Sequence, residues 1–355
     1  MPARAQGAPN AVYLGARVDA AGAASVAAFD LDGRELFACA LPARGHDMAV
    51  RPGQGEFVVF ARRPGRFALV IDAATGGLRH TISALPERHF YGHGVYSADG
   101  RLLYCTENGL DDGDGRIGVY DAGNGYARIG EFASTGVGPH DIALLPGGQG
   151  RLAVANGGIR THPSTGRDVL NLYSMRPNLA LIDAASGECL ERIELPDDLR
   201  LSSLRHIDVD AGGRIAFGCQ WAGDMADAPP LVGLVERGRA RLFDMPETDL
   251  GRLAGYIGSV AFDARGAVIA ATAPNGGAMV LFDAGSGRYL GQKRITDVCG
   301  IAAVPAAGAA PLGAGAFVAS SGNAGVRLVA VEDERMLPDS LRRFVWDNHL
   351  QLLRA

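Results

Sequence analysis

The sequence lacks the features that mark several common classes of protein. No run of apolar residues in the 355-residue chain is long enough to span a membrane, so we expect no membrane-spanning segment. The net charge is −5 and basic residues form no block or stripe, which argues against a nucleic-acid-binding surface. A GxSxG segment and a phosphate-cradling glycine loop are also missing, so serine-hydrolase and nucleotide-binding readings are unsupported.

Cysteine is scarce as well. The five cysteines stand alone and form no CxxC or CxxCH pair, which leaves zinc-ribbon, thioredoxin-type and c-type haem sites unsupported. Isolated free cysteines behave as small apolar residues, so we expect them in buried strands. The first ten residues contain no apolar stretch of the signal-peptide type, and we interpret 1–10 as a disordered remnant of a leader.

The sequence does contain a strand–turn–strand unit that recurs along the chain. The stretch HFYGHGVYSADGRLLYCTEN, from His89 to Asn108, holds two apolar runs around an Asp-Gly turn, which is a strong hairpin signal. Further copies open at His46, His140, His206, Ile257 and Cys299. Both the step from His46 to His93 and the step from His93 to His140 are 47 positions. A period in the forties made of strands and turns is typical of a propeller.

A second repeated element alternates with the first and completes a four-stranded blade. It is an apolar run, a turn of acidic and small residues and another apolar run, as in ALVIDAATGGLRHTI and LALIDAASGECLERIEL. The two elements together predict an all-β, WD40-like, seven-bladed β-propeller that forms a single domain over 1–355. The expected blades are 46–83, 93–134, 140–195, 206–246, 257–295, 299–338, and 347–355 joined to 11–41. Pairing of the N- and C-terminal strands in the last blade would close the ring and leave no long unpaired edge.

The period is broken mainly by a long insertion. Residues 157–178 separate the second and third strands of the third blade. A loop of this length is usually functional or mobile, and its position predicts that it lies on the channel-mouth face.

Propeller geometry indicates which side chains meet. The first strand of each blade lines the channel, and its start lies near the end of the second strand. Candidate metal ligands at these positions are His46, His93, His140, His206, His349 and Glu107. Candidate contacts to a bound ligand are the amides Asn156, Gln220, Asn275 and Asn323.

Two interpretations of the histidines remain open at this point. Imidazole is a common ligand for iron and copper, so the set predicts a metal or small-ligand site at the channel mouth, with His93, His140 and His206 closest together. The alternative is that each histidine bonds a neighbouring blade's backbone. Asp47 and Asp141, which directly follow two of the histidines, favour this structural role because His–Asp pairs join WD-type blades.

Two other functional classes also remain open. In a lactonase-like hydrolase, Glu107 and the asparagines Asn156, Asn275 and Asn323 would surround a calcium ion. A protein-interaction scaffold would need no small ligand at all. Because no catalytic motif is present, we expect a binding protein rather than an enzyme, and a monomer.

Several phrases resemble one bacterial family of uncharacterised seven-bladed propellers, known only as a domain of unknown function. They include YGHGVYSADGRLLYCTEN, RPNLALIDAASGE, LRHIDVDAGGRIAFGCQW and the closing WDNHL, and the resemblance covers nearly the whole chain. In that family a twin-arginine leader usually precedes the domain, and the gene lies near imelysin-type iron-uptake proteins. The resemblance therefore implies a periplasmic accessory protein linked to iron uptake, with imelysin-type proteins as partners. It implies no established reaction.

Overall fold

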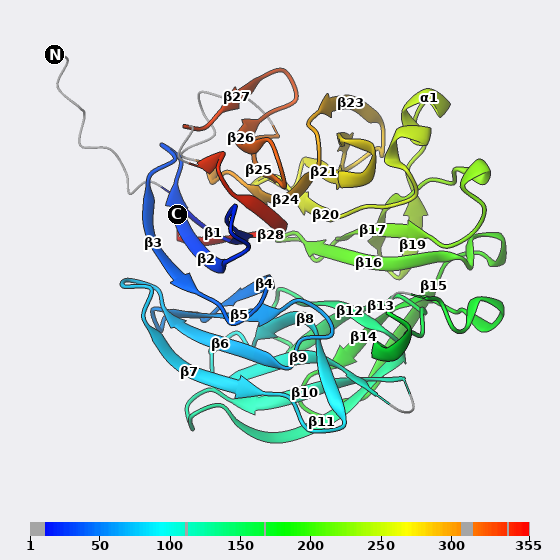
Figure 1. Ribbon diagram of the computed structural model, residues 1–355. Coiled ribbons are helices and arrows are strands. Elements are labelled where there is room, and N and C mark those ends of the chain that lie inside the picture. Colours follow the sequence, from blue (N-terminus) through cyan, green and yellow to red (C-terminus); the bar gives the residue numbers. More distant parts are fainter. Residues whose placement is uncertain (1–10, 111–112, 167, 307–314, 339–340, 355) are drawn as a thin grey trace, which may run out of the picture.

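The chain folds into a ring of seven blades around a central channel (Figure 1). The computed structural model describes residues 11–110, 113–166, 168–306, 315–338 and 341–354. Each blade is a four-stranded antiparallel sheet, which confirms the predicted seven-bladed β-propeller. The expectation for 1–10 lies outside the described residues.

The blades follow one another in chain order, and the strands of each run from the channel outwards. The closing blade has β28 (Val345–Arg354) innermost, followed by β1 (Val12–Val18), β2 (Ala24–Asp30) and β3 (Glu35–Ala40). The second blade consists of β4 (Gly45–Val50), β5 (Glu56–Ala61), β6 (Phe67–Asp72) and β7 (Leu78–Ser83). The third consists of β8 (Arg88–Tyr96), β9 (Leu102–Gly109), β10 (Asp114–Asp121) and β11 (Ala127–Val137). The fourth consists of β12 (Pro139–Leu144), β13 (Arg151–Asn156), β14 (Asn178–Asp183) and β15 (Cys189–Glu194). The fifth blade consists of β16 (Ser202–Val209), β17 (Ile215–Trp221), β18 (Val232–Glu236) and β19 (Arg239–Leu242). The sixth consists of β20 (Ser259–Phe262), β21 (Val268–Ala273), β22 (Ala278–Asp283) and β23 (Tyr289–Arg294). The seventh consists of β24 (Val298–Ala303), β25 (Phe317–Ser321), β26 (Gly325–Val329) and β27 (Glu334–Met336).

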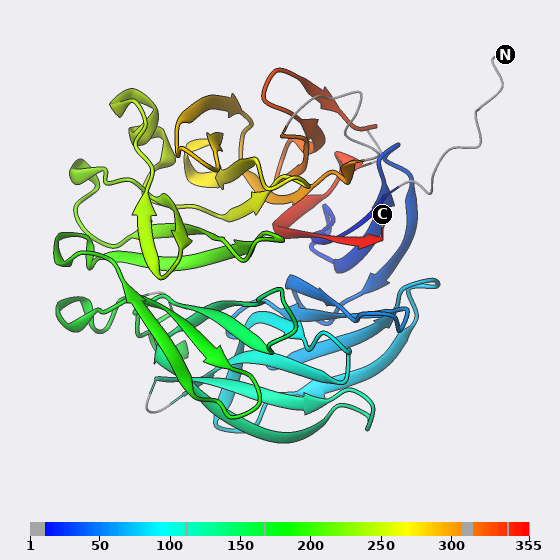
Figure 2. The ribbon, with the colours of Figure 1, turned by 180° about the vertical axis from the view of Figure 1, so that it is seen from behind.

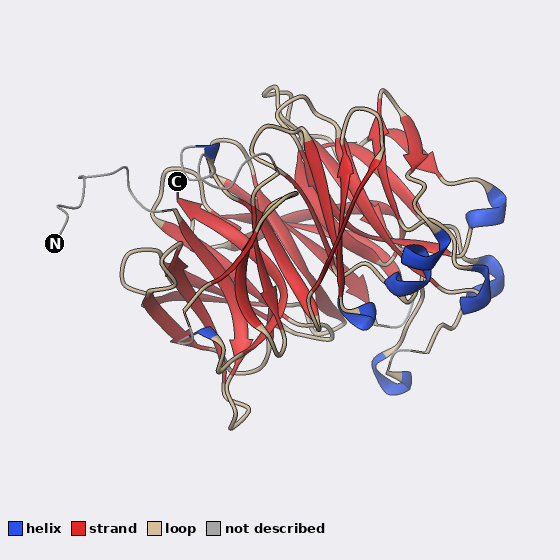
Figure 3. Cartoon of the chain, turned by 90° about the horizontal axis from the view of Figure 1, so that it is seen from above, coloured by secondary structure: helices blue, strands red, loops and turns tan. Residues whose placement is uncertain are grey.

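Helical structure is confined to short turns on the connections (Figure 3). These are α1 (Glu247–Leu250) and the 3-10 turns η1 (Pro163–Thr165), η2 (Leu172–Ser174), η3 (Asp197–Leu199), η4 (Met225–Asp227), η5 (Gly251–Leu253) and η6 (Pro274–Gly276). No helix in the described part of the chain is long and apolar enough to cross a membrane.

The two ends of the chain close the ring, as predicted. Strand β28 pairs antiparallel with β1, with Tyr13 opposite Leu352 and Leu14 opposite Gln351. Both views of the ribbon show the red C-terminal strand against the blue N-terminal strands (Figures 1 and 2). The fully buried Trp346 packs edge-on against Phe29 of β2, with ring centroids 5.3 Å apart. Closure thus buries apolar surface and also pairs the edge of β1, which would otherwise be free.

The turns between the third and fourth strands explain one of the two sequence repeats. In the turn after β6, the Asp72 carboxylate accepts hydrogen bonds from the Ala74 and Thr75 amides and from the Thr75 hydroxyl. Gly76 then adopts a φ of 73°, a left-handed conformation that favours glycine. Asp183 with Ser186 and Asp283 with Ser286 form the same turn in two other blades. The Asp-x-x-Ser/Thr-Gly pattern therefore has a local structural cause.

The inner strands begin earlier than the sequence repeat suggested. Strand β8 begins at Arg88 rather than at His93, and β16 begins at Ser202 rather than at His206. His93 and His206 therefore lie in the middle of their strands, at a greater depth in the channel than predicted.

Candidate metal centre

Five histidines meet inside the channel. They project from the inner strands of five consecutive blades, namely His349 on β28, His46 on β4, His93 on β8, His140 on β12 and His206 on β16. Ring centroids of adjacent pairs lie between 4.7 and 5.2 Å apart. All five predicted histidines thus form one cluster, called the histidine cluster below.

A β-bulge in each of these strands directs its histidine. The register of pairing shifts beside every one of the five, for example between Gly45 and Met48 on β4 and between Phe90 and Gly94 on β8. A bulge re-aims side chains and bends its strand, so it can turn a ring towards the channel axis. Gly92 on β8 also makes room, because a Cβ atom there would lie 2.6 Å from Cδ2 of His46. The glycine before His93 is therefore part of the site.

His93 differs from the other four because two carboxylates hold it. Its Nδ1 lies 3.2 Å from Asp47 and 3.2 Å from Asp141, which are the residues that follow two of the other histidines. Burial alone would lower the pKa of His93, but the two carboxylates outweigh it and raise the pKa to about 10. The pKa of Asp47 is held below its usual range: burial acts to raise it, but the hydrogen bond to His93 and the charge interactions with His349 and His93 together outweigh burial.

The remaining four rings are neutral at physiological pH. Burial is the main reason that the pKa is lowered in His46, His140, His206 and His349. The lowering of the His46 pKa is partly offset, because Nδ1 of His46 lies 3.6 Å from the Asp347 carboxylate. A neutral imidazole offers a lone pair, which is the form that binds a metal.

The cluster leaves many ring nitrogens without a hydrogen-bond partner. These buried atoms are Nδ1 of His46, Nε2 of His93, Nδ1 of His140, both nitrogens of His206 and Nε2 of His349. Within the described part of the chain, none of the five rings bonds to backbone, in contrast to His89, whose Nδ1 contacts the Phe90 carbonyl. The alternative in which each histidine bonds a neighbouring blade's backbone therefore does not describe this arrangement, although the contacts of His93 with Asp47 and Asp141 do join three blades.

Two histidine trios come within reach of a common ion. The nitrogens of His93, His140 and His206 lie within 4.8 Å of one another, and so do those of His46, His93 and His349. The first trio is the one expected from the sequence, and the second was not anticipated. Two nitrogens on one ion can be at most twice about 2.0–2.2 Å apart. Small ring rotations would therefore bring either trio into coordination.

The cluster separates two funnels. The funnel on the side of the insertion has a volume of about 740 Å³, and His46 and His140 lie at its base. The opposite funnel, of about 450 Å³, has His206 and His349 at its base. The histidines therefore lie inside the channel rather than around one mouth. The reason is that the inner strands begin before the histidines.

Charges divide between the funnels. Arginine side chains line the larger one, called the basic funnel below: Arg44, Arg62, Arg63 and Arg205. Aspartates line the smaller, acidic funnel: Asp47, Asp141 and Asp208. Burial raises the pKa of Asp208 to about 6, although the Phe262 and Val209 amides donate hydrogen bonds to it.

The structure places Glu107 away from the cluster. Its buried carboxylate accepts from the Tyr120 hydroxyl at 2.7 Å and from Arg128 at 2.9 Å, both on the outer strands of the same blade. Glu107 therefore projects from the same sheet face as Tyr120 and Arg128. The structure does not place Glu107 beside the histidines, where the sequence analysis expected it.

The four predicted amides divide into two pairs. Gln220 and Asn275 line the basic funnel, as expected. Asn156 instead donates to the Ser134 carbonyl and to the Asn178 side chain, between blades. Asn323 remains in its own turn beside Ser321. The calcium set of the hydrolase alternative is thus dispersed.

Sequence reasoning named Asp47 and Asp141 only in the structural alternative, and it missed two arginines of the site. The two aspartates do act across blade boundaries: besides its contact with His93, Asp141 accepts from the Ile207 amide of the next inner strand. Arg62 follows β5 at the strand end where the other blades have amides, and the same rule would have found it. Arg205 had no such signal, because its direction depends on the bulge in β16.

Comparison with known proteins places the chain in a family. The model of a family described as "Protein of unknown function (DUF1513)" matches residues 39–353, which include all five histidines. The chain belongs to the DUF1513 family. A comparison with curated proteins finds no match for this DUF1513 chain.

Solved structures share its fold. One is "Kuenenia stuttgartiensis Hydrazine Synthase", with a TM-score of 0.63 and 16% identity over 86% of this chain and 89% of that one. Another is the β-propeller domain of Cps50 (Swd1) from Myceliophthora thermophila, written "Myceliophteria_thermophila" in its title, with a TM-score of 0.59 and 12% identity over 91% of this chain and 98% of that one. At such identities the likeness shows the propeller fold alone, because one fold hosts many functions.

Proposed function

We propose that this protein binds a transition-metal ion at the histidine cluster and acts as a binding protein rather than an enzyme. The observation that carries the proposal is the convergence of five buried rings with unpartnered nitrogens. A buried polar atom without a partner costs about 1–3 kcal/mol, so six of them in one place need a compensating ligand. A metal ion can use several of these lone pairs at once.

His93 supports the same proposal through its carboxylate partners. In many metal sites a histidine donates one ring N–H to a carboxylate, which fixes the tautomer and leaves the other nitrogen for the metal. His93 has Asp47 and Asp141 at Nδ1 and an unpartnered Nε2, and a metal bound there would displace the Nε2 proton that the raised pKa retains. The two carboxylates would also offset part of the charge of a bound cation.

We further propose iron as the physiological ion, with copper as the alternative, and an accessory role in periplasmic iron uptake beside imelysin-type partners. Imidazole suits both metals. The choice of iron and of these partners rests on the resemblance of the sequence phrases to the family described above. The geometry supports a metal without distinguishing the two.

The test is a metal-loading experiment on protein first stripped with a chelator and then dialysed. The protein is loaded anaerobically with Fe²⁺, Cu²⁺ or Zn²⁺, and bound metal is counted by elemental analysis. We expect one ion per chain in the wild type and a strong loss in the double variant His93→Ala/His140→Ala, because His93 belongs to both trios. The controls His80→Ala and His162→Ala remove histidines outside the cluster and should load normally.

Other outcomes would redirect the assignment. A wild type that retains no transition metal would overturn the proposal and favour the interaction scaffold. Calcium binding with lactone turnover would favour the hydrolase instead.

A further inference from the structure

The basic funnel has the composition of a small-molecule site. Its volume of about 740 Å³ lies within the range of about 300–1,000 Å³ that is typical of ligand pockets. Four arginines line it together with one acidic residue, Asp297, and the buried Asp347 forms ion pairs with two of them, Arg44 and Arg62. Apolar side chains, among them Trp221 and Ile159, form other parts of the wall. Such a lining suits an organic anion better than a bare inorganic one.

Two of the arginines approach from opposite sides of the ring. Arg62 follows β5, whereas Arg205 lies on β16, and their blades are separated by two complete blades in one direction around the ring and by three in the other. Each guanidinium is oriented by a side-chain partner. Arg62 contacts Asp347 at 2.9 Å, and Arg205 donates to Gln220.

Tyr256 connects these two positions. Its hydroxyl accepts from Asn348, the neighbour of the aspartate that holds Arg62, at 3.0 Å. Its backbone pairs with Gln220, the partner of Arg205. Burial raises the pKa of Tyr256, and both Arg205 and Arg62 act against this rise, which agrees with both charges lying near the phenol. Arg62, Tyr256 and Arg205 thus form an arc across the funnel above His46 and His140.

We infer that the basic funnel binds a small organic dicarboxylate, with one carboxylate on the Arg62 side and the other on the Arg205 side. A guanidinium fork matches the two oxygens of a carboxylate. Two forks on opposite walls match an anion with two carboxylates, and the apolar wall accommodates the carbon chain between them. The usual helix N-terminus for a phosphate is missing from the described residues, where no helix exceeds four residues. The site is independent of the proposed metal, because its contacts come from arginine and tyrosine.

Calorimetric titration of the metal-free protein tests this inference. The probes are succinate, glutarate and citrate, with acetate and inorganic phosphate for comparison. We expect one dicarboxylate per chain, weaker binding of acetate, and an affinity that falls as salt increases. Arg205→Gln should weaken dicarboxylate binding at least tenfold.

A matched control and a second variant keep the test decisive. Arg192→Gln makes the same change on β15, where Arg192 pairs with Glu194 at the surface, and should bind like the wild type. Arg62→Gln should reproduce the loss seen with Arg205→Gln, provided that its thermal unfolding remains cooperative. Absence of dicarboxylate binding in the wild type, or full affinity in Arg205→Gln, would overturn the inference. Phosphate binding as tight as succinate binding would overturn the assignment to carboxylates. Failure of metal loading would leave this result unaffected, so the two proposals fall separately.

Discussion

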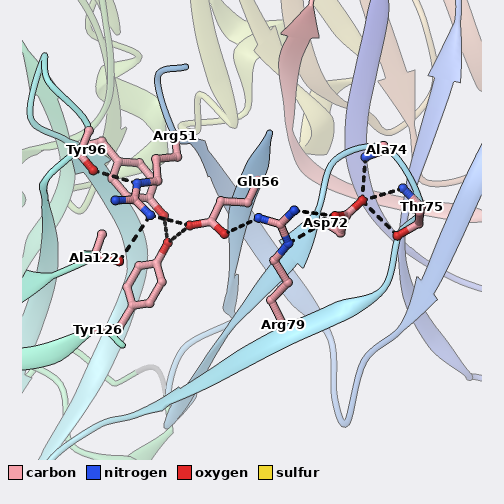
Figure 4. A network of polar contacts seen from close by, with 10 residues as sticks. Arg51, Glu56, Asp72, Ala74, Thr75, Arg79, Tyr96, Ala122 and Tyr126 are labelled. Atoms are coloured by element: carbon pink, nitrogen blue, oxygen red, sulfur yellow. Dashed lines mark hydrogen bonds and ion pairs between the residues drawn. The ribbon is translucent and has the colours of Figure 1, made fainter. Parts of the chain in front are cut away.

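Two polar clusters of this propeller are built in opposite ways. The first surrounds Glu56 and joins the β4–β7 blade to the β8–β11 blade (Figure 4). The Glu56 carboxylate accepts from Arg51 and Arg79 at 2.8 Å each and from the Tyr126 hydroxyl at 2.6 Å. Tyr126 is also 2.6 Å from the Tyr96 hydroxyl. Every charge in this network has a partner.

The histidine cluster lies on the inner strands of these and neighbouring blades and leaves six buried nitrogens without partners. A satisfied polar network can stabilise a fold, whereas unsatisfied buried groups cost free energy. The comparison teaches that burial of polar residues does not by itself identify a site. Buried polar atoms that lack hydrogen-bond partners are what identifies a candidate site.

The largest effect should come from removing β28, which carries His349 and closes the ring. Deletion of residues 346–355 would expose the edge of β1 and remove the buried Trp346 from the core. We expect loss of cooperative thermal unfolding in circular dichroism. The single variant His349→Ala should keep a cooperative transition. If the truncated chain unfolds like the wild type, closure is not what holds the ring together.

Breaking the satisfied network should cost stability but not metal binding. Glu56→Ala removes a buried carboxylate from the partly buried Arg51, and breaking a buried ion pair costs about 3–5 kcal/mol of unfolding free energy. Glu194→Ala removes an exposed ion pair with Arg192 and should cost at most about 1 kcal/mol. Urea titrations measure both values. Equal costs for the two variants would contradict the assigned role of the Glu56 network.

Changes in the histidine cluster should show the reverse pattern. Asp141→Asn removes a carboxylate from His93, and loss of such an outer partner typically lowers metal affinity about 10–100-fold. His140→Ala removes a ligand of the first trio and should weaken binding at least as much. We expect each variant to change the stability of the metal-free protein by less than Glu56→Ala does. A His140→Ala protein with normal metal affinity but a large loss of stability would make the cluster structural.

The smallest effect concerns Asp208, a carboxylate of the acidic funnel without a cationic partner among its hydrogen bonds. Its pKa in the folded protein is about 6, above the usual value of 3.8, so the stability it contributes is full below pH 3.8 and is lost as the pH rises through 6. Between pH 5 and pH 7 the wild type should lose about 1 kcal/mol relative to Asp208→Asn. Paired urea titrations at the two pH values measure this difference. A constant difference would mean that Asp208 titrates normally.

The sequence repeat was sufficient to predict the fold, because hairpin spacing and the Asp-x-x-Ser/Thr-Gly turns are local properties. The period of 47 residues indicated the blades, and WDNHL near the C-terminus indicated the closing strand. The convergence of the five histidines also followed from the topology, since equivalent positions of inner strands must meet around one axis.

The site predictions that did not match the structure were those that depended on the direction of a single side chain. Glu107 and Asn156 lie near the ends of their strands, as predicted, but face neighbouring strands and blades instead of the channel. The alternation of side chains along a strand decides which face of the sheet each residue points from, and an error of one residue in the register reverses that face. The bulges that set the depth of His93 and His206 leave no clear mark in the sequence, so the two funnels were not foreseen.

X-ray absorption spectroscopy of the zinc-loaded protein tests the central claim most directly. With one Zn²⁺ per chain, our account predicts at least three imidazole nitrogens at about 2.0–2.1 Å from the ion. It also predicts that this signal is lost in His93→Ala/His140→Ala, which breaks both trios, and kept in His80→Ala. A zinc shell made only of oxygen atoms, or an imidazole signal that survives in the double variant, would contradict a metal centre at the histidine cluster.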